Sequence, residues 1–141
     1  MTEIPEPFRY TGHLIRRAEQ RHVAAWQSHS PDASNVVFAS LIVIERRPGC
    51  SQRELGDELD LDRSTIADLV RRLETGGLIT RTASTVDRRR FELNVTTAGA
   101  DELRRLRPIA VAIEDELIGT MSPEDLSTFR RLLQIVLRPK T

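Results

Sequence analysis

The sequence predicts a mainly α (α+β) fold built around a winged helix-turn-helix unit, with long helices on both sides of it in the chain. Apolar residues recur at helical spacing through most of the 141 residues. Between residues 51 and 75, two short helical patterns are separated by a tight turn. Residues 78–95 then read as two strands joined by an Arg-rich loop. We call this hairpin the wing, and residues 35–99 the winged lobe.

The composition and length of the chain restrict the classes of protein to which it can belong. Lys+Arg and Asp+Glu each number 21, so the formal net charge is zero and affinity for nucleic acid must come from local clusters. The length suits a single domain spanning residues 1–141. There is no long apolar run or signal-peptide pattern, and one cysteine allows no intramolecular disulfide. We therefore expect a cytoplasmic protein with no membrane segment.

The elements before the helix-turn-helix are an arm and two helices. Residues 1–7 are acidic and contain proline, which predicts an extended arm. A helical pattern runs from Phe8 to about Ser28. A second helix, capped by Ser34, is expected to run to Arg47. It is apolar almost all round, which predicts a buried central helix.

The helix-turn-helix begins with a capping box, in which Ser51 and Glu54 satisfy each other's backbone N–H groups. Asp60 begins the turn, and either Asp62 or Ser64 can cap the second helix. The buried face of that helix is predicted from the spacing of Ile66, Leu69, Val70 and Leu73.

The opposite face of the second helix is the candidate base-reading surface. Short polar side chains near a helix N-terminus can approach base edges while guanidinium groups hold phosphates. The candidate DNA contacts on this helix are Arg63, Ser64, Thr65, Asp68, Arg71 and Arg72. Gln52 and Arg53, at the start of the preceding helix, are added to them. The alternative is a solvated helix face.

The wing follows two glycines, Gly76 and Gly77, which accept positive φ and end the helix. Strands are expected over residues 78–83 and 91–95, the second with alternating apolar residues. Its tip places several guanidinium groups on a thin projection that can enter a minor groove. Asp87 is expected to fix a neighbouring Arg by a bidentate pair. The candidate contacts here are Asp87, Arg88, Arg89 and Arg90.

Two further helices are predicted after the wing. Thr96 is expected to cap a long helix that Pro108 should kink and Gly119 should end. Ser122 and Pro123 then start the last helix. The helices outside the winged lobe carry more apolar surface than the lobe can cover, which predicts association.

These motifs together resemble the MarR type of bacterial transcription regulator. The resemblance runs from about Asn35 to Leu137. It rests on Glu54-Leu55, Asp62-x-Ser64-Thr65-Ile66, Arg72-Leu73-Glu74, Gly77-Leu78-Ile79, Asp87-Arg88-Arg89 and Thr96-x-x-Gly99. The sequence departs from the family at Gly56, where Ala is usual, and at Ala67-Asp68, which replace more polar or basic residues. These departures bear on the operator sequence.

The resemblance implies a homodimer that binds a pseudo-palindromic operator in double-stranded DNA, usually as a repressor released by a small ligand. Its dimerisation helices would lie in residues 1–34 and 100–141, with recognition helices ~34–36 Å apart. Carried over by position, Arg72 grips the DNA backbone, and Arg89 enters the minor groove, steadied by Asp87. The positions that read bases are Ser64, Thr65 and Asp68.

The resemblance also implies an effector site between the dimerisation helices and the winged lobe. An Arg beside an aromatic wall suits an aromatic carboxylate or a CoA thioester. The candidate ligand contacts are His13, Arg16, Arg17, His22, Trp26 and Phe38. The alternative is that the arginines are solvated or pair with Glu19 and that Trp26 belongs to the dimer core.

The sequence disfavours three other functions. A metal-sensing regulator is disfavoured because His22 and His29 are seven residues apart and no Cys-x-x-Cys pair exists, so no metal site is expected. An enzyme is disfavoured because no phosphate loop or nucleophile motif occurs, so no cofactor is expected. A winged-helix module for protein contacts alone would not need the wing arginines. Cys50 is expected to be a small filler and not a redox sensor.

Overall fold

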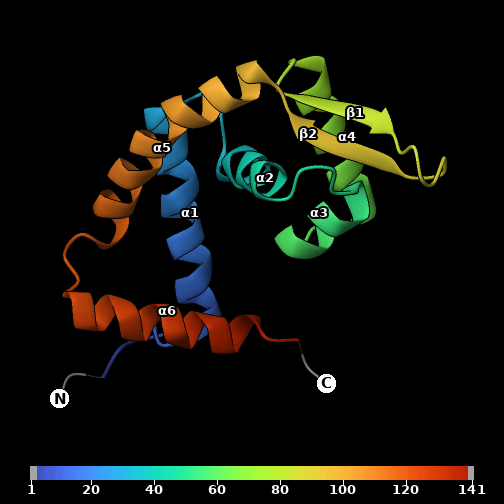
Figure 1. Ribbon diagram of the computed structural model, residues 1–141. Coiled ribbons are helices and arrows are strands. Elements are labelled where there is room, and N and C mark those ends of the chain that lie inside the picture. The colour runs from blue at the N-terminus through green and yellow to red at the C-terminus, as the bar shows by residue number, and fades with distance from the viewer. Residues whose placement is uncertain (1–2, 140–141) are drawn as a thin grey trace.

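The computed structural model describes residues 3–139. In this part of the chain it forms six helices and one antiparallel sheet of two strands, which confirms the predicted fold class. In chain order the elements are α1 (Thr11–His29), α2 (Asn35–Arg46), α3 (Gln52–Leu59), α4 (Arg63–Thr75), β1 (Ile79–Ala83), β2 (Phe91–Val95), α5 (Thr97–Ile118) and α6 (Pro123–Leu137). Figure 1 shows α2 between an arm made of α1 and α5 and a lobe made of α3, α4 and the wing.

The winged lobe has its own core, centred on α2. Leu41 of α2, Leu55 of α3 and Leu93 of β2 are fully buried in one cluster. The strands pair from Ile79 opposite Val95 to Ala83 opposite Phe91. The expectation of a buried central helix is confirmed, because α2 packs against α3, α5 and β2.

Side chains cap five helix starts as the sequence predicts. The Ser51–Glu54 capping box is complete. Hydroxyl oxygens accept the first-turn N–H groups of α2, α5 and α6, from Ser34, Thr96 and Ser122. At α4 the cap is Asp62, which accepts the Thr65 N–H at 2.8 Å.

The first helix begins later than predicted. Residues 6–9 form turns, in which Phe8 N–H donates to the Pro5 carbonyl and Tyr10 N–H to that of Pro7. Tyr10, at the cap position, makes no side-chain cap bond. The Phe8 ring, in the turn before α1, lies 5.7 Å from the His13 ring in the first turn of the helix, measured between ring centres.

Several boundaries shift by one residue. Helix α2 ends at Arg46, with Arg47 as its C-cap, and β1 begins at Ile79. Only Gly77 of the two glycines has positive φ, at 75°, whereas Gly76 is still helical. Helix α5 continues through Pro108 and ends at Ile118, with Gly119 as its C-cap, and it is drawn as a bent arch in Figure 1.

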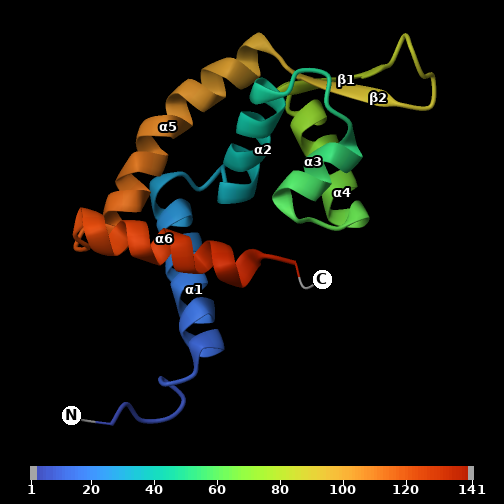
Figure 2. The same ribbon diagram turned by 60° about the horizontal axis from the view of Figure 1, so that its bottom comes forward.

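Helix α6 lies outside both cores. A second cluster joins α1 to α5 through Trp26, Leu106 and Ile113. By contrast, α6 crosses near α1 with no buried residue of its own (Figure 2). Its exposed apolar side chains are Phe129, Leu132, Ile135, Val136 and Leu137. Across residues 3–139, no helix is both long and apolar enough to cross a membrane.

Candidate nucleic-acid interface

Helix α4 turns its polar residues away from the winged core. Ile66, Leu69, Val70 and Leu73 are buried, as the spacing predicted. Arg63, Ser64, Thr65, Asp68, Arg71 and Arg72 are all exposed. The Ser64 hydroxyl donates to Asp62 at 2.9 Å, so its oxygen is left as an acceptor. The Asp62 carboxylate thus accepts hydrogen bonds from both Thr65 and Ser64. The bond from the Thr65 N–H, followed by the bonds from the Thr65 and Ser64 hydroxyls, lowers the pKa of the Asp62 carboxyl.

The outward face of α4 carries one acid among arginines. Asp68 accepts from Arg71 Nη1 at 3.3 Å, and its other oxygen lies 3.9 Å from Arg72 Nε. All three side chains are more than half exposed. The arginines are thus held on the outward face, beside an acceptor.

The wing tip is shaped by two side chains that bond to backbone. The buried Ser84 hydroxyl accepts from the N–H groups of Val86 and Asp87, both at 3.2 Å. The Asp87 carboxylate accepts from the Arg89 N–H at 3.0 Å. Sequence reasoning missed Ser84, although a Ser two residues before the exposed turn is a typical turn-forming signal.

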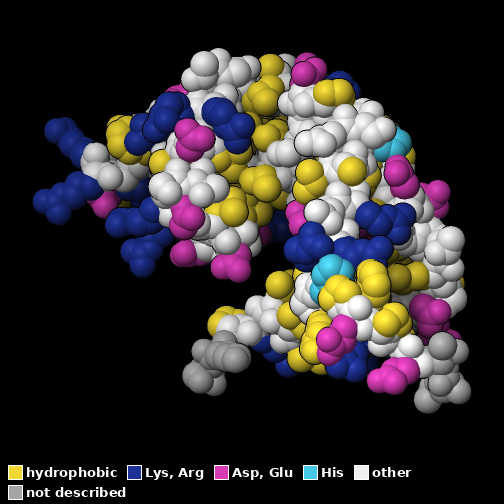
Figure 3. Space-filling model, turned by 180° about the vertical axis from the view of Figure 1, so that it is seen from behind, with side chains coloured by type: hydrophobic (Ala, Val, Ile, Leu, Met, Phe, Trp, Pro, Cys, Tyr) yellow, Lys and Arg dark blue, Asp and Glu magenta, His cyan; other side chains and the backbone are white. Residues whose placement is uncertain are grey.

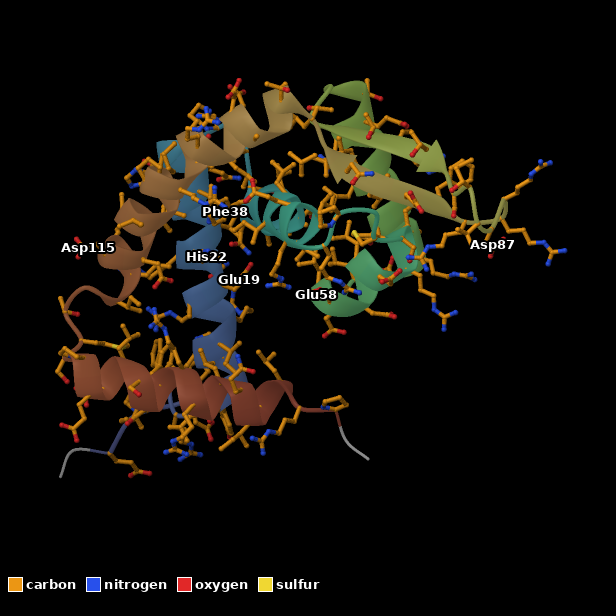
Figure 4. All side chains as sticks on the ribbon, in the orientation of Figure 1. Glu19, His22, Phe38, Glu58, Asp87 and Asp115 are labelled. Atoms are coloured by element: carbon orange, nitrogen blue, oxygen red, sulfur yellow. The ribbon has the colours of Figure 1, made fainter. Side chains whose placement is uncertain are left out.

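The expected role of Asp87 is wrong in its detail. No ion pair joins its carboxylate to an arginine among residues 3–139, and the bond that it makes is to the backbone N–H of Arg89. It fixes the turn that carries the arginines and does not grip a guanidinium. Figure 4 shows it at the far end of the wing.

Arg90, predicted as a DNA contact, ties the wing to α3 in this structure. Its guanidinium pairs with Glu54, which also pairs with Arg47 at 2.6 Å. Arg47 in turn lies 2.9 Å from Glu58, which pairs with Arg46 as well. This ion-pair chain joins the end of the wing loop, next to Phe91, to α3 and to the end of α2. Figure 4 labels Glu58 at its α3 end.

Glu54 lies at the centre of this ion-pair chain. Partial burial raises the pKa of its carboxyl, but the Ser51 hydroxyl and N–H bonds and the charges of Arg90 and Arg47 outweigh burial, and the pKa is held below its usual range. The carboxylate therefore stays ionised and holds the wing at neutral pH. Sequence analysis identified Glu54 only as a capping residue, because its partner Arg90 is 36 residues away.

Four other candidate arginines form no ion pair in the described part of the chain. Within residues 3–139, no acid pairs with Arg53, Arg63, Arg88 or Arg89, and all four are exposed. Gln52 is half-buried at the start of α3. In Figure 3, Arg side chains project from the wing end of the molecule. Helix α4 and the wing tip thus combine free guanidinium groups with short polar side chains.

The candidate ligand residues fall into two groups. His22, Trp26 and Phe38 lie together, because Trp26 Nε1 donates to His22 Nε2 at 3.1 Å and the two aromatic rings are 5.5 Å apart. Figure 4 shows His22 and Phe38 on facing helices, with Glu19 one turn away. Trp26 is only 3% exposed, so in this chain it acts as core.

The other three candidates lie on the outer half of α1. His13 contacts Phe8, and the Arg17 guanidinium lies 5.4 Å from the same ring. Arg16 borders a shallow depression lined by α1 residues alone. The structure therefore does not bring the arginines and the aromatic pair to one enclosed cavity within this chain.

Neither the single cysteine nor the acidic and His side chains form a reactive centre in the described residues. Cys50 is 3% exposed, and burial, followed by the charge of Glu54, raises the pKa of its thiol. A thiol kept protonated in the core fits the predicted filler role. In residues 3–139, no three His, Cys, Asp or Glu side chains form a group that could hold a metal ion.

Comparisons with known proteins point to one family. A family model described as "MarR family" matches residues 35–90. The transcriptional regulator HosA of Escherichia coli is 30% identical over 122 residues, covering 86% of this chain and 90% of HosA.

Solved structures share the whole fold. The PcaV transcriptional regulator from Streptomyces coelicolor, in complex with its natural ligand, matches with a TM-score of 0.90 and 29% identity over 96% of each chain. The transcriptional repressor CouR, bound to a 23-mer DNA duplex, matches with a TM-score of 0.87, covering 97% of this chain and 100% of CouR. At 24% identity, the second likeness concerns the fold alone.

Proposed function

The chain belongs to the MarR family of transcriptional regulators, and from that premise we propose a homodimeric repressor that binds a pseudo-palindromic operator and leaves it when a small anionic ligand binds. Helix α4 enters the major groove and the wing tip the adjacent minor groove. One observation carries the DNA-binding part: Arg63 on α4 and Arg88 and Arg89 on the wing, whose turn Ser84 and Asp87 order, are exposed and have no acidic partner in the described chain. CouR, which was solved on a DNA duplex, has the same fold.

The wing contact is tested by the salt dependence of DNA binding. Arg89→Ala should weaken binding to every fragment and flatten the plot of log affinity against log salt by about one unit, because each lost phosphate contact releases one fewer counterion. The matched control is Arg104→Ala, an exposed arginine on α5 that pairs only with Asp101 in the described chain. If both variants keep the wild-type slope, the wing assignment is wrong.

Base reading by α4 needs a different readout. Thr65→Ala should leave the salt slope unchanged and relax the sequence preference, because a hydroxyl at a base edge carries sequence information and no charge. The assay is competition between the DNA upstream of the gene and an unrelated fragment of equal length. A protein-contact module would bind both fragments equally and weakly.

We propose that the effector is an aromatic carboxylate or its CoA thioester, held between α1, α2 and α5. The support is the His22–Trp26–Phe38 group, which places an imidazole beside an aromatic wall. PcaV, solved with its natural ligand, has this fold at 29% identity. To drive near-complete release, the ligand must favour the non-binding form by ~10⁴-fold.

Trp26 supplies the test for the effector, because it is the only tryptophan in the chain. Binding beside it should change its emission, and the same compounds should release the dimer from DNA. Benzoate, a hydroxybenzoate and an aroyl-CoA are the probes, with cyclohexanecarboxylate as the non-aromatic control. Release without any change in Trp26 emission would move the site away from this group.

A further inference from the structure

Asp68 occupies the middle of the DNA-facing stripe of α4. With Ser64 and Arg71 it follows the i, i+4, i+7 spacing of one helix face, opposite the buried Ile66–Leu73 stripe. Its side chain is 62% exposed. An acid here lies where the proposed function brings a DNA groove.

A carboxylate is an unfavourable side chain at this place unless it meets a donor. Phosphates on both sides of the groove repel it, and each oxygen must exchange water for another partner. In the major groove the base edges offer donors only as the amino groups of cytosine N4 and adenine N6. A carboxylate on the reading face therefore selects for one of these two groups.

Arg71 decides between the two bases. Its Nη1 donates to Asp68 at 3.3 Å, which holds the guanidinium beside the carboxylate and leaves its remaining N–H groups free. Together the pair presents an acceptor next to a fork of donors. A C·G pair shows the complementary edge: the cytosine N4 donor next to the guanine O6 and N7 acceptors. In an A·T pair the amino donor separates the two acceptors, so the fork is left half satisfied.

We propose that Asp68 and Arg71 together read one C·G base pair in each operator half-site, with Asp68 accepting from cytosine N4 and Arg71 donating to guanine O6 and N7. The inference rests on the proposed function, because it needs α4 in a major groove. It names the base pair that α4 selects at one position. Arg72, 3.9 Å from the other carboxylate oxygen, completes the neutralisation of the acid.

The test is selection of binding sites from random double-stranded DNA, carried out with the full chain and its variants. The wild type should select C·G at one pair of symmetry-related positions, with discrimination of about tenfold or more over the other pairs. Asp68→Asn should shift that position to A·T, because an amide pairs with adenine N6 and N7. Asp68→Ala should weaken the C·G preference there without abolishing it, because Arg71 still donates to guanine, and it should bind unrelated DNA more tightly.

A matched control exists on α5. Asp101 pairs with Arg104 at 2.7 Å with the same i, i+3 spacing, and its side chain is 60% exposed. Asp101→Asn should select the wild-type motif unchanged. All variants are first shown to share the wild-type circular dichroism and thermal midpoint.

The outcomes separate this inference from the proposed function. If the wild type selects a motif but Asp68→Asn changes no single position, Asp68 only orients the arginines and the inference is overturned while the regulator function stands. A wild type that selects no motif at all overturns both. A switch confined to one symmetric position, absent from the Asp101→Asn control, establishes the assignment.

Discussion

Gly99, in the first turn of α5, packs tightly against the wing. A Cβ on Gly99 would lie 2.1 Å from the Leu78 carbonyl oxygen and 2.7 Å from Val95 Cγ1. Gly99→Ala should therefore lower the free energy of unfolding by about 1–3 kcal/mol, because backbone at the contact cannot give way cheaply. Urea unfolding at fixed protein concentration measures the change.

The control for that substitution is Gly12→Ala. A Cβ at Gly12 meets no atom within 4 Å, and the residue lies in the first turn of α1. Its replacement should be neutral or stabilise the protein by up to about 1 kcal/mol. If the two substitutions changed the free energy of unfolding equally, the close contact between Gly99 and the Leu78 carbonyl would not be the cause of the loss.

Glu54 predicts how stability depends on pH. Its folded pKa is lowered, whereas an unfolded glutamate titrates near ~4.3. The stability that it contributes is therefore fully present above about pH 4.3 and is lost as the pH falls through the folded pKa. Glu54→Gln keeps an N3 capping side chain but cannot ionise. The stability gap between wild type and Glu54→Gln should shrink as the pH is lowered into that range.

Unfolding curves between about pH 3 and pH 7 provide this measurement. Glu74→Gln, at an exposed acid on α4 with no ion pair in the described chain, is the control and should show no such closing gap. A gap for Glu54→Gln that stays constant with pH would show that the ion-pair chain adds nothing beyond the cap.

Among the elements, the wing shows what local sequence can and cannot predict. The caps were predictable, because each joins residues three apart. The anchoring of Arg90 was not, because its partner is on α3. The alternation in β2 correctly placed Leu93 in the core. Phe91 is 39% exposed, because its end of the strand projects beyond the lobe. The Arg81 guanidinium lies 3.9 Å from the centre of the Phe91 ring and covers one of its faces.

Arg88 and Arg90 should therefore behave differently although both lie in the wing. Arg90→Ala should speed amide exchange over residues 84–90 by a few fold, because an exposed ion pair contributes at most about 1 kcal/mol to holding the wing. Arg88→Ala should leave exchange unchanged and flatten the salt slope of DNA binding. Hydrogen exchange by mass spectrometry and a salt titration measure the two effects. The reverse pattern would return Arg90 to the DNA surface and make Arg88 the anchor.

At the scale of the whole molecule, the helix pattern predicted every long helix but not how helices from distant parts of the chain would meet. The candidate ligand residues show the limit. Six side chains on α1 and α2 were grouped by helix and chemistry, and the structure places Trp26 and Phe38 in a core cluster and Arg16 on an outer face. Helix periodicity predicts which face of a helix is buried, and Pro108 predicts a kink in α5. Where α6 crosses depends on contacts between residues far apart in the sequence.

The uncovered apolar face of α6 is the strongest sign of a second chain. Leu132 is 47% exposed and Phe129 38%, on a helix with no buried residue. Exposed apolar surface of this kind favours association at ~25 cal/mol per Å² removed from water. Leu132→Glu would place a charge on that face and should convert the proposed dimer to monomer, as light scattering measures. DNA affinity should fall with it, because one winged lobe engages only one half-site. Ser127→Glu, on the polar side of α6, should keep both the dimer and its affinity. If Leu132→Glu stays dimeric and keeps its affinity, the second chain does not pack on α6.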